Sequence, residues 1–154
     1  MNVITDYPVA YDSLDHLCPE GTDNNTSLSF IEESLQYYKN IGFESIKFLD
    51  LGCSGGQLVI DFHNKGNIAL GLEGSDYSLL NKRANWPEWG NKLLFTCDIT
   101  KPYKIVKENE QIKFNLITAW EVIEHILLKD LEQTFININN HLEDYGMFVG
   151  SIAQ

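Results

Sequence analysis

The sequence of 154 residues carries 22 acidic and 11 basic side chains, which give a formal net charge of −11. Such an acidic chain is a poor candidate for binding DNA or long RNA, because affinity for a phosphate backbone rests heavily on lysine and arginine. The length fits one domain with a sizeable core, and the 44% hydrophobic content is typical of a soluble globular protein.

The cysteines and the N-terminus indicate where the protein resides. Cys18, Cys53 and Cys97 cannot all pair with one another, and none forms a C-x-x-C unit. A reducing compartment is therefore the simplest expectation. The sequence has neither a secretory signal nor an apolar run near the roughly 18 residues that a membrane span needs. We expect a cytoplasmic protein without a membrane span.

Residues 1–44 are expected to form an N-terminal loop followed by one helix. Two prolines, Gly21 and a polar run at residues 22–26 predict irregular structure over residues 1–26. Ser29 and Glu32 form a capping box that predicts the start of the helix, and Gly42 should end it. Apolar residues recur along this helix at helical spacing: Leu28, Ile31, Leu35 and Tyr38.

Residues 45–154 alternate between predicted strands and helices. Strands are expected at residues 47–51, 68–72, 93–96, 114–119 and 147–152. Helices are expected at residues 57–64, 77–85 and 129–141. This alternation indicates a parallel sheet with helices on both faces. The last helix carries an apolar stripe that should face the sheet: Leu128, Leu131, Phe135, Ile138 and Leu142.

The first of these strands ends in a glycine-rich turn, Gly52-Cys-Ser-Gly-Gly56, with Asp50 just before it. Residues without side chains let backbone N–H groups and a following helix N-terminus approach a ligand closely. A glycine-rich turn that binds nothing is the alternative. A dinucleotide fingerprint starting at Gly52 would need glycine at positions 54 and 57, which are Ser54 and Gln57, so NAD is disfavoured.

Three further predicted strands also end in polar residues. The second ends at Glu73, the third at Asp98, and the fourth runs into Trp120-Glu-Val-Ile-Glu-His125. In an open α/β sheet, a ligand binds beyond the carboxyl ends of the strands, where the strand order reverses. We therefore expect these strand ends to meet the glycine-rich turn in one site.

Together these features resemble the S-adenosylmethionine site of the class I methyltransferases. The turn is similar to that family's D-x-G-x-G-x-G loop at Asp50, Gly52 and Gly56, while Ser54 replaces the middle glycine. The resemblance implies an α/β, Rossmann-like three-layer sandwich with a mainly parallel sheet. It also implies S-adenosyl-L-methionine as cofactor and S-adenosylhomocysteine as product, bound by residues 45–154.

The resemblance also assigns roles to the strand ends. The methionine part of the cofactor would lie over the loop, where the Ser54 hydroxyl could contact its carboxylate. Glu73 would accept hydrogen bonds from the ribose hydroxyls, and Asp98 one from the adenine amino group. A surface carboxylate at Glu73 and a turn or cap role for Asp98 remain alternatives. The implied cofactor-binding set is Asp50, Gly52, Cys53, Ser54, Gly56, Glu73, Gly74, Asp98, Ile99 and Trp120.

The segment Glu121-Val-Ile-Glu-His125 resembles the corresponding part of ubiquinone-type O-methyltransferases and small-RNA 2′-O-methyltransferases. In some members the two glutamates and the histidine bind a divalent metal. On a helical turn Glu121, Glu124 and His125 would share one face, which is a plausible ligand spacing. We expect no metal here, with these three as the candidate ligands; backbone capping by the glutamates and a buried hydrogen bond of His125 are the alternatives.

The predicted function is methyl transfer from S-adenosylmethionine to a small-molecule, sugar or lipid-type acceptor at oxygen. His125 is the predicted general base and Glu124 its orienting partner. Tyr7, Tyr11 and His16 lie in a segment that often forms a lid in this family, which makes residues 1–44 a candidate lid. Residues 86–89 form an aromatic loop that we expect to pack on the sheet edge, with a position beside the adenine or a substrate as the alternative.

Two other functions are weighed against this one. A cofactor-binding partner subunit or fragment without activity of its own is the main alternative, because the sequence lacks the usual C-terminal antiparallel strand pair. We expect either self-association into a homo-oligomer or a truncated chain. A DNA base methyltransferase is disfavoured, because it would need an Asp/Asn-Pro-Pro-Tyr/Phe stretch where Ala119-Trp-Glu121 stands.

Overall fold

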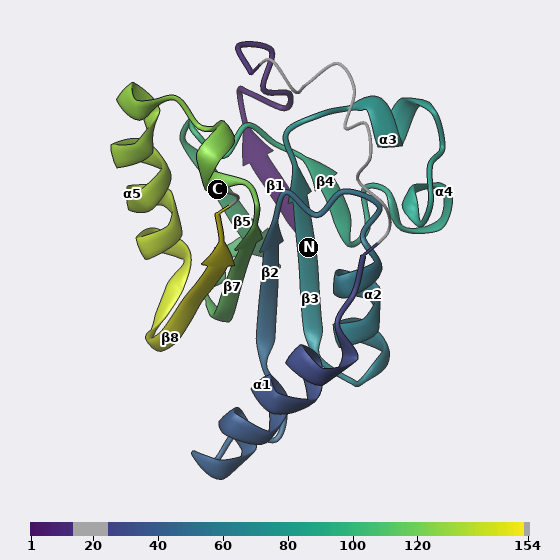
Figure 1. Cartoon of the computed structure of the whole chain (residues 1–154), viewed down its shortest axis with the longest axis vertical. Helices are drawn as coiled ribbons and strands as arrows, with labels where there is room; N and C mark the ends of the chain where they lie inside the picture. Colours follow the sequence, from purple (N-terminus) through teal and green to yellow (C-terminus); the bar gives the residue numbers. More distant parts are fainter. Residues whose placement is uncertain (14–24, 153–154) are drawn as a thin grey trace.

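The computed structural model describes residues 1–13 and 25–152 (Figure 1). Its main sheet has five parallel strands in the order β4-β3-β2-β7-β8. The strand order reverses between β2 and β7, which is where an open α/β sheet binds its ligand. The strands are β2 (Lys47–Leu51), β3 (Ile68–Glu73), β4 (Leu94–Thr96), β7 (Phe114–Trp120) and β8 (Leu142–Ser151).

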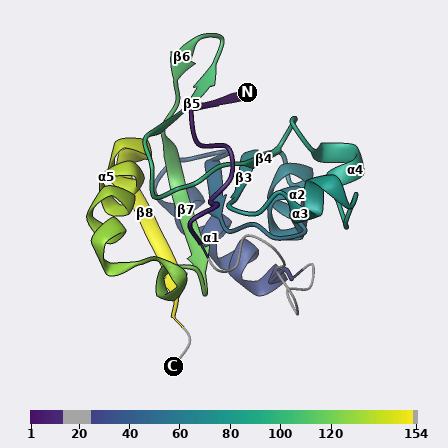
Figure 2. The ribbon, with the colours of Figure 1, turned by 90° about the horizontal axis from the view of Figure 1, so that it is seen from above.

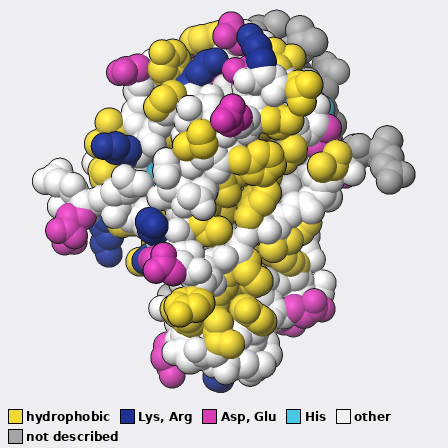
Figure 3. Space-filling view, turned by 90° about the vertical axis from the view of Figure 1, so that its left-hand side faces the viewer, with side chains coloured by type: hydrophobic (Ala, Val, Ile, Leu, Met, Phe, Trp, Pro, Cys, Tyr) yellow, Lys and Arg dark blue, Asp and Glu magenta, His cyan; other side chains and the backbone are white. Residues whose placement is uncertain are grey.

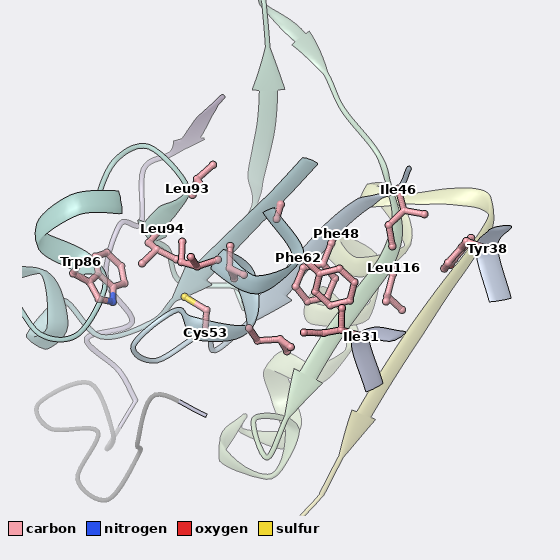
Figure 4. Close-up of a cluster of buried hydrophobic side chains, with 14 residues drawn as sticks. Ile31, Tyr38, Ile46, Phe48, Cys53, Phe62, Trp86, Leu93, Leu94 and Leu116 are labelled. Atoms are coloured by element: carbon pink, nitrogen blue, oxygen red, sulfur yellow. The ribbon is translucent and has the colours of Figure 1, made fainter. Parts of the chain in front are cut away.

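Helices pack on both faces of this sheet, as Figure 2 shows from above. On the side of α1 and α2, the rings of Phe48 and Phe62 stack 3.9 Å apart within a buried cluster (Figure 4). A second buried cluster fills the side of α5 and includes Ile138. The three-layer arrangement and the parallel sheet agree with the prediction. The helices are α1 (Leu28–Asn40), α2 (Gln57–Asn64), α3 (Tyr77–Leu80), α4 (Trp86–Trp89) and α5 (Leu131–His141).

A small antiparallel sheet accompanies the main one, and it was not predicted. Its strands are β1 (Asn2–Thr5), β5 (Tyr103–Lys107) and β6 (Glu110–Gln111), in the order β1-β5-β6. The irregular structure predicted for residues 1–26 is therefore wrong at β1, which forms by pairing with a strand far along the chain. Glu108 and Asn109 connect β5 to β6 with φ of 53° and 69°, without the Asn-Gly sequence that usually marks such a turn.

Only part of the predicted apolar stripe of α5 faces the core: Ile138 is buried and Leu142 packs against the same cluster, whereas two other members are largely exposed. Leu128 precedes the helix and is 86% exposed, and Phe135 is 45% exposed. Asn137 instead faces inward, where its side-chain amide donates to the carbonyls of Ile99 and Lys101 at 2.9 and 2.8 Å. Polar residues occupy this face because they satisfy backbone groups of an irregular segment beneath the helix. The buried residues of α5 are Thr134, Asn137, Ile138 and His141.

Three element boundaries also differ from the prediction. The cap of α1 is Ser27, whose side chain accepts from the Phe30 N–H at 3.3 Å, and not Ser29. The helix predicted over residues 77–85 stops after one turn, because Lys82 and Ala84 adopt left-handed backbone with φ of 53° and 49°. Strand β8 begins five residues before the predicted position, directly after α5.

Among the described residues, no helix has the length and apolarity that crossing a membrane requires. Residues Cys18 and His16, which entered the sequence predictions, lie outside the described ranges. Cys53 and Cys97 are both buried and free.

Candidate active site

The residues predicted to form the site lie at the carboxyl ends of β2, β3, β4 and β7. Asp50 in β2 is opposite Thr118 in β7, and the Thr118 hydroxyl donates to the Asp50 carboxylate at 2.6 Å. Asp50 is 4% exposed, and its burial raises the pKa of its carboxyl to about 7. Asp50 therefore lies inside the sheet, beneath the glycine-rich turn.

The glycine-rich turn after β2 depends on left-handed backbone. Gly52, Ser54 and Gly56 have φ of 72°, 48° and 85°. A Cβ added to Gly52 would collide with the Val122 side chain, and one added to Gly56 would collide with Leu94. The space beside these two glycines is thus occupied by the protein's own Val122 and Leu94 side chains. The contact of Val122 with Gly52 also joins the turn to the segment after β7.

Cys53 is a packing residue of this turn. Its N–H donates to the Leu72 carbonyl at 3.0 Å, and its side chain fills the space beside Gly71. Burial, with the nearby Glu73 and Asp50 carboxylates, raises the pKa of its thiol well above the ordinary value. The thiol is therefore neutral and unreactive.

Glu73 connects the end of β3 to the turn. One carboxylate oxygen accepts from the Ser54 N–H at 2.7 Å, and the other accepts from the Ser75 N–H at 3.2 Å. Burial raises the pKa of this carboxyl, while these backbone donors, the Gly74 N–H and the charge of Arg83 lower it. A carboxylate has about four acceptor positions, so Glu73 keeps capacity for a ligand hydroxyl beside these backbone donors.

The N-terminal segment crosses the carboxyl ends of β3 and β4. The Ala10 N–H donates to the Gly74 carbonyl, and the Asp98 N–H donates to the Tyr7 carbonyl, both at 2.9 Å. A Cβ on Gly74 would approach the Ala10 Cβ to 3.3 Å. This segment therefore lies directly over Gly74 and Asp98, two of the predicted cofactor-binding residues.

Asp98 accepts hydrogen bonds within its own turn, which was the predicted alternative to adenine binding. One of its carboxylate oxygens accepts from the Thr100 N–H at 2.9 Å and from the Thr100 hydroxyl at 2.6 Å. Ile99 is 8% exposed and belongs to the core cluster on the α5 side. The second Asp98 oxygen keeps acceptor capacity, so the turn contacts and a contact to an amino group are compatible.

The segment after β7 carries an aromatic residue and both predicted catalytic residues, and it meets the glycine-rich turn through Val122. Trp120 is 37% exposed and meets the Phe30 ring edge to face at 5.1 Å. Glu121 has a φ of 55°, and a 3-10 turn follows at Ile123–His125. Glu124 is partly buried, whereas His125 is exposed.

The predicted helical turn that would align a metal-binding triad is wrong. Glu121 lies before the 3-10 turn in left-handed backbone, so it does not share a helical face with Glu124 and His125. Over residues 1–13 and 25–152, no three His, Cys, Asp or Glu side chains gather closely enough to hold a metal ion.

Three residues at this site were missed by the sequence predictions. Arg83 and Asn85 lie between α3 and α4, Trp86 is the first residue of α4, and each donates a hydrogen bond to the glycine-rich turn. They follow no apolar periodicity and end no strand, so no pattern indicated them. The one available signal was the predicted packing of residues 86–89. This packing is confirmed for Trp86, which is 2% exposed. Residues 86–89 form the short helix α4 and not the predicted loop.

The comparison with known proteins decides the family. A model described as "Methyltransferase domain" matches residues 49–148, a span that includes the glycine-rich turn, Glu73, Asp98 and the segment after β7. This chain belongs to the methyltransferase domain family. The class predicted from the strand-end pattern is thereby confirmed.

Relatives of this methyltransferase domain are longer proteins. A ubiquinone biosynthesis O-methyltransferase of Parvibaculum lavamentivorans is 27% identical over 109 residues, which cover 67% of this chain and 42% of that protein. The chain therefore spans less than half the length of this curated relative.

Two solved structures share the fold of this methyltransferase domain. The glycopeptide N-methyltransferase MtfA has 19% sequence identity and a TM-score of 0.55, over 86% of this chain and 55% of that one. A TehB-like S-adenosylmethionine-dependent methyltransferase of Corynebacterium glutamicum has 18% identity and a TM-score of 0.54, over 80% and 73% of the two chains. At these identities the likeness shows the Rossmann-like fold and nothing further.

Proposed function

We propose that this methyltransferase domain binds S-adenosyl-L-methionine and transfers its methyl group to an oxygen of a small-molecule, sugar or lipid-type acceptor. The observation that carries the proposal is the contact between Glu73 and the Ser54 N–H. It places an acidic acceptor with spare capacity against the glycine-rich turn, and this turn follows β2, beside which the strand order reverses. The ubiquinone O-methyltransferase relative supports oxygen as the acceptor atom.

The side chains present fit the chemistry of this cofactor. Glu73 would hold the ribose hydroxyls, Asp98 the adenine amino group, and the turn from Cys53 to Gly56 the methionine part. Asp50 would act by shaping the turn, because it is buried and bonded to Thr118. MtfA, which shares this fold at a TM-score of 0.56 and 18% identity, has been solved with S-adenosylmethionine.

S-adenosylmethionine, when bound, supplies an activated methyl group on a good leaving group. The protein then has to hold the acceptor in line and exclude water, which supplies much of the rate acceleration. His125, which is exposed, is the proposed base that removes the proton of the acceptor hydroxyl, and Glu124 is proposed to orient it. Val122 connects their segment to Gly52 and so keeps both close to the cofactor loop.

Apolar surface near these residues supports the acceptor class. Trp120 and Phe30 form an aromatic pair at the end of β7, and Leu127 and Ile152 are 52% and 63% exposed. An acceptor with an apolar or ring portion would cover these side chains. The N-terminal segment, fixed at Gly74 and Asp98, would act as the lid over the opposite end of the site.

The test is transfer of a radiolabelled methyl group from S-adenosylmethionine to a panel of hydroxyl-bearing acceptors. We expect a labelled product, and we expect His125→Ala to lower turnover by at least about 100-fold with unchanged cofactor affinity. His63→Ala, which alters a histidine packed against Trp89, is the matched control and should retain turnover. Cofactor binding without transfer to any acceptor would favour the non-catalytic partner subunit instead.

A further inference from the structure

The segment between α3 and α4 turns back toward the glycine-rich turn. Lys82 and Ala84 take left-handed backbone, which non-glycine residues adopt at an energetic cost and which concentrates at functional sites. The backbone at these two left-handed residues brings Arg83, Asn85 and Trp86 into contact with residues 54–57. We call these three residues the clamp.

Each clamp residue donates to a different acceptor of the turn. The Trp86 indole N–H donates to the Ser54 carbonyl at 2.7 Å, and the Asn85 side-chain amide donates to the Gly55 carbonyl at 3.2 Å. The Arg83 guanidinium donates to the Ser54 hydroxyl at 3.3 Å. Trp86 is 2% exposed in the core cluster that also contains Cys53 and Leu94 (Figure 4), so its indole is held in place by packing.

Ser54 connects the clamp to Glu73, on the ligand-binding side of the turn. Its carbonyl and hydroxyl accept from the clamp, while its N–H donates to Glu73. Ser54 is also the one non-glycine residue of this turn with left-handed backbone, at a φ of 48°. The clamp thus fixes a strained residue whose other contact is the proposed ribose acceptor.

We infer that the clamp is a set of positioning residues that holds the glycine-rich turn and Glu73 in the arrangement that binds S-adenosylmethionine, and so sets the affinity for this cofactor. The inference rests on the proposed function. Preorganisation of this kind lowers the cost of ordering the loop when the ligand binds. Arg83 adds a second effect, because its charge favours the ionised, hydrogen-bond-accepting form of Glu73.

The first experiment compares two tryptophans of α4. Trp86→Phe keeps an aromatic ring in the core and removes the N–H that donates to Ser54, whereas Trp89→Phe alters a tryptophan that packs on His63. Calorimetric titration with S-adenosylhomocysteine should show Kd raised by about tenfold in Trp86→Phe and by less than about twofold in Trp89→Phe. Circular dichroism checks that both variants are folded.

The second experiment removes the charge of a clamp residue and measures how S-adenosylhomocysteine binding depends on pH. A residue that only supported the fold would not change this pH dependence. Within residues 1–13 and 25–152, the titratable or charged groups that interact with Glu73 are Asp50, Cys53 and Arg83. Removing the charge in Arg83→Gln should raise the pH below which S-adenosylhomocysteine binding is lost. Lys92→Gln removes a charge from an exposed residue after α4 and should leave the profile in place.

The outcomes separate this inference from the proposed function. If folded wild-type protein binds no S-adenosylhomocysteine, both are overturned. If the wild type binds and both Trp86→Phe and Arg83→Gln match it in affinity and pH profile, the clamp inference alone is overturned. If Trp86→Phe fails to fold, Arg83→Gln at the partly exposed position decides the question.

Discussion

Asp50 has an unusual environment for a carboxylate at a ligand site. Burial raises the pKa of its carboxyl from 3.8 to about 7, the Thr118 hydrogen bond opposes this, and the charge of Glu73 adds to it. The folded protein therefore binds a proton at Asp50 over a pH range in which the unfolded chain has released it. That difference makes stability depend on pH.

The free energy of unfolding should fall as pH rises from about 4 to about 7, because the contribution of protonated Asp50 is lost through this range. Asp50→Asn mimics the protonated form and should flatten this dependence in urea unfolding at a series of pH values. Burial lowers the pKa of His141, which makes the free energy of unfolding rise with pH. Because both proteins contain His141, this contribution cancels when their pH profiles are compared. Parallel pH profiles of the two proteins would contradict the prediction.

Tyr103 and Tyr38 form a natural pair for testing buried hydroxyls. In the described part of the chain, the Tyr103 hydroxyl has no hydrogen-bond partner, whereas the Tyr38 hydroxyl donates to the Asn115 carbonyl. Tyr103→Phe should leave the free energy of unfolding unchanged or raise it by about 1 kcal/mol, and Tyr38→Phe should lower it by about 1 kcal/mol or more. Urea unfolding measures both. A loss of stability in Tyr103→Phe equal to that in Tyr38→Phe would disprove this view of Tyr103.

Residues at strand ends could be predicted from the sequence, while residues that act on them could not. Glu73 and Asp98 each follow a short apolar run, so a strand prediction places them at the ligand edge of a parallel sheet. Arg83 and Trp86 reach the turn through two left-handed residues, and ordinary side chains at those positions give no sign of that backbone. Gly52 was assigned to ligand approach, but only the structure shows Val122 filling its space.

Helix α5 shows how tertiary contacts override periodicity. Asn137 is buried and donates to two carbonyls in the segment after β4, whereas Asn139 on the same helix is exposed. Asn137→Ala would leave those carbonyls without a donor and should lower the free energy of unfolding by about 2–3 kcal/mol. Asn139→Ala is the matched control, with an expected change below about 0.5 kcal/mol. Equal losses measured by urea unfolding would refute the role given to Asn137.

The main-sheet elements were predictable because each apolar run coincides with a strand, and β2, β3 and β7 are mostly buried. Strand β2 and helix α2 have the predicted bounds, and the other strands differ mainly at their ends. The β5–β6 hairpin and β1 were missed for a physical reason, since their strands are short and depend on one another for pairing. Ile138 of the α5 stripe is buried as predicted, while Asn137 was missed because it faces inward to satisfy backbone carbonyls and not to bury apolar area.

On the scale of the whole molecule, one face of the domain is apolar. Figure 3 shows hydrophobic side chains running across the face that carries α5 and β8. Tyr145 in β8 is 82% exposed, and Phe135 and Ile136 in α5 are each 45% exposed. β8 is also the last strand in the order of the main sheet, and such an edge favours pairing with another chain.

We therefore predict that the isolated chain self-associates. Sedimentation velocity over a range of concentrations should show the weight-average mass rising with concentration, and high salt should not reverse an association driven by apolar contact. A single monomeric species at every concentration would contradict this prediction.

Binding of S-adenosylhomocysteine is the most direct test of the central claim, that the strand ends of this domain form a cofactor site. Calorimetry on the purified chain should give a Kd on the order of micromolar. Glu73→Ala should abolish binding, and Glu88→Ala, which alters an exposed glutamate of α4, should not change it. A folded wild-type chain that does not bind, or a Glu73→Ala variant that binds equally well, would contradict the account.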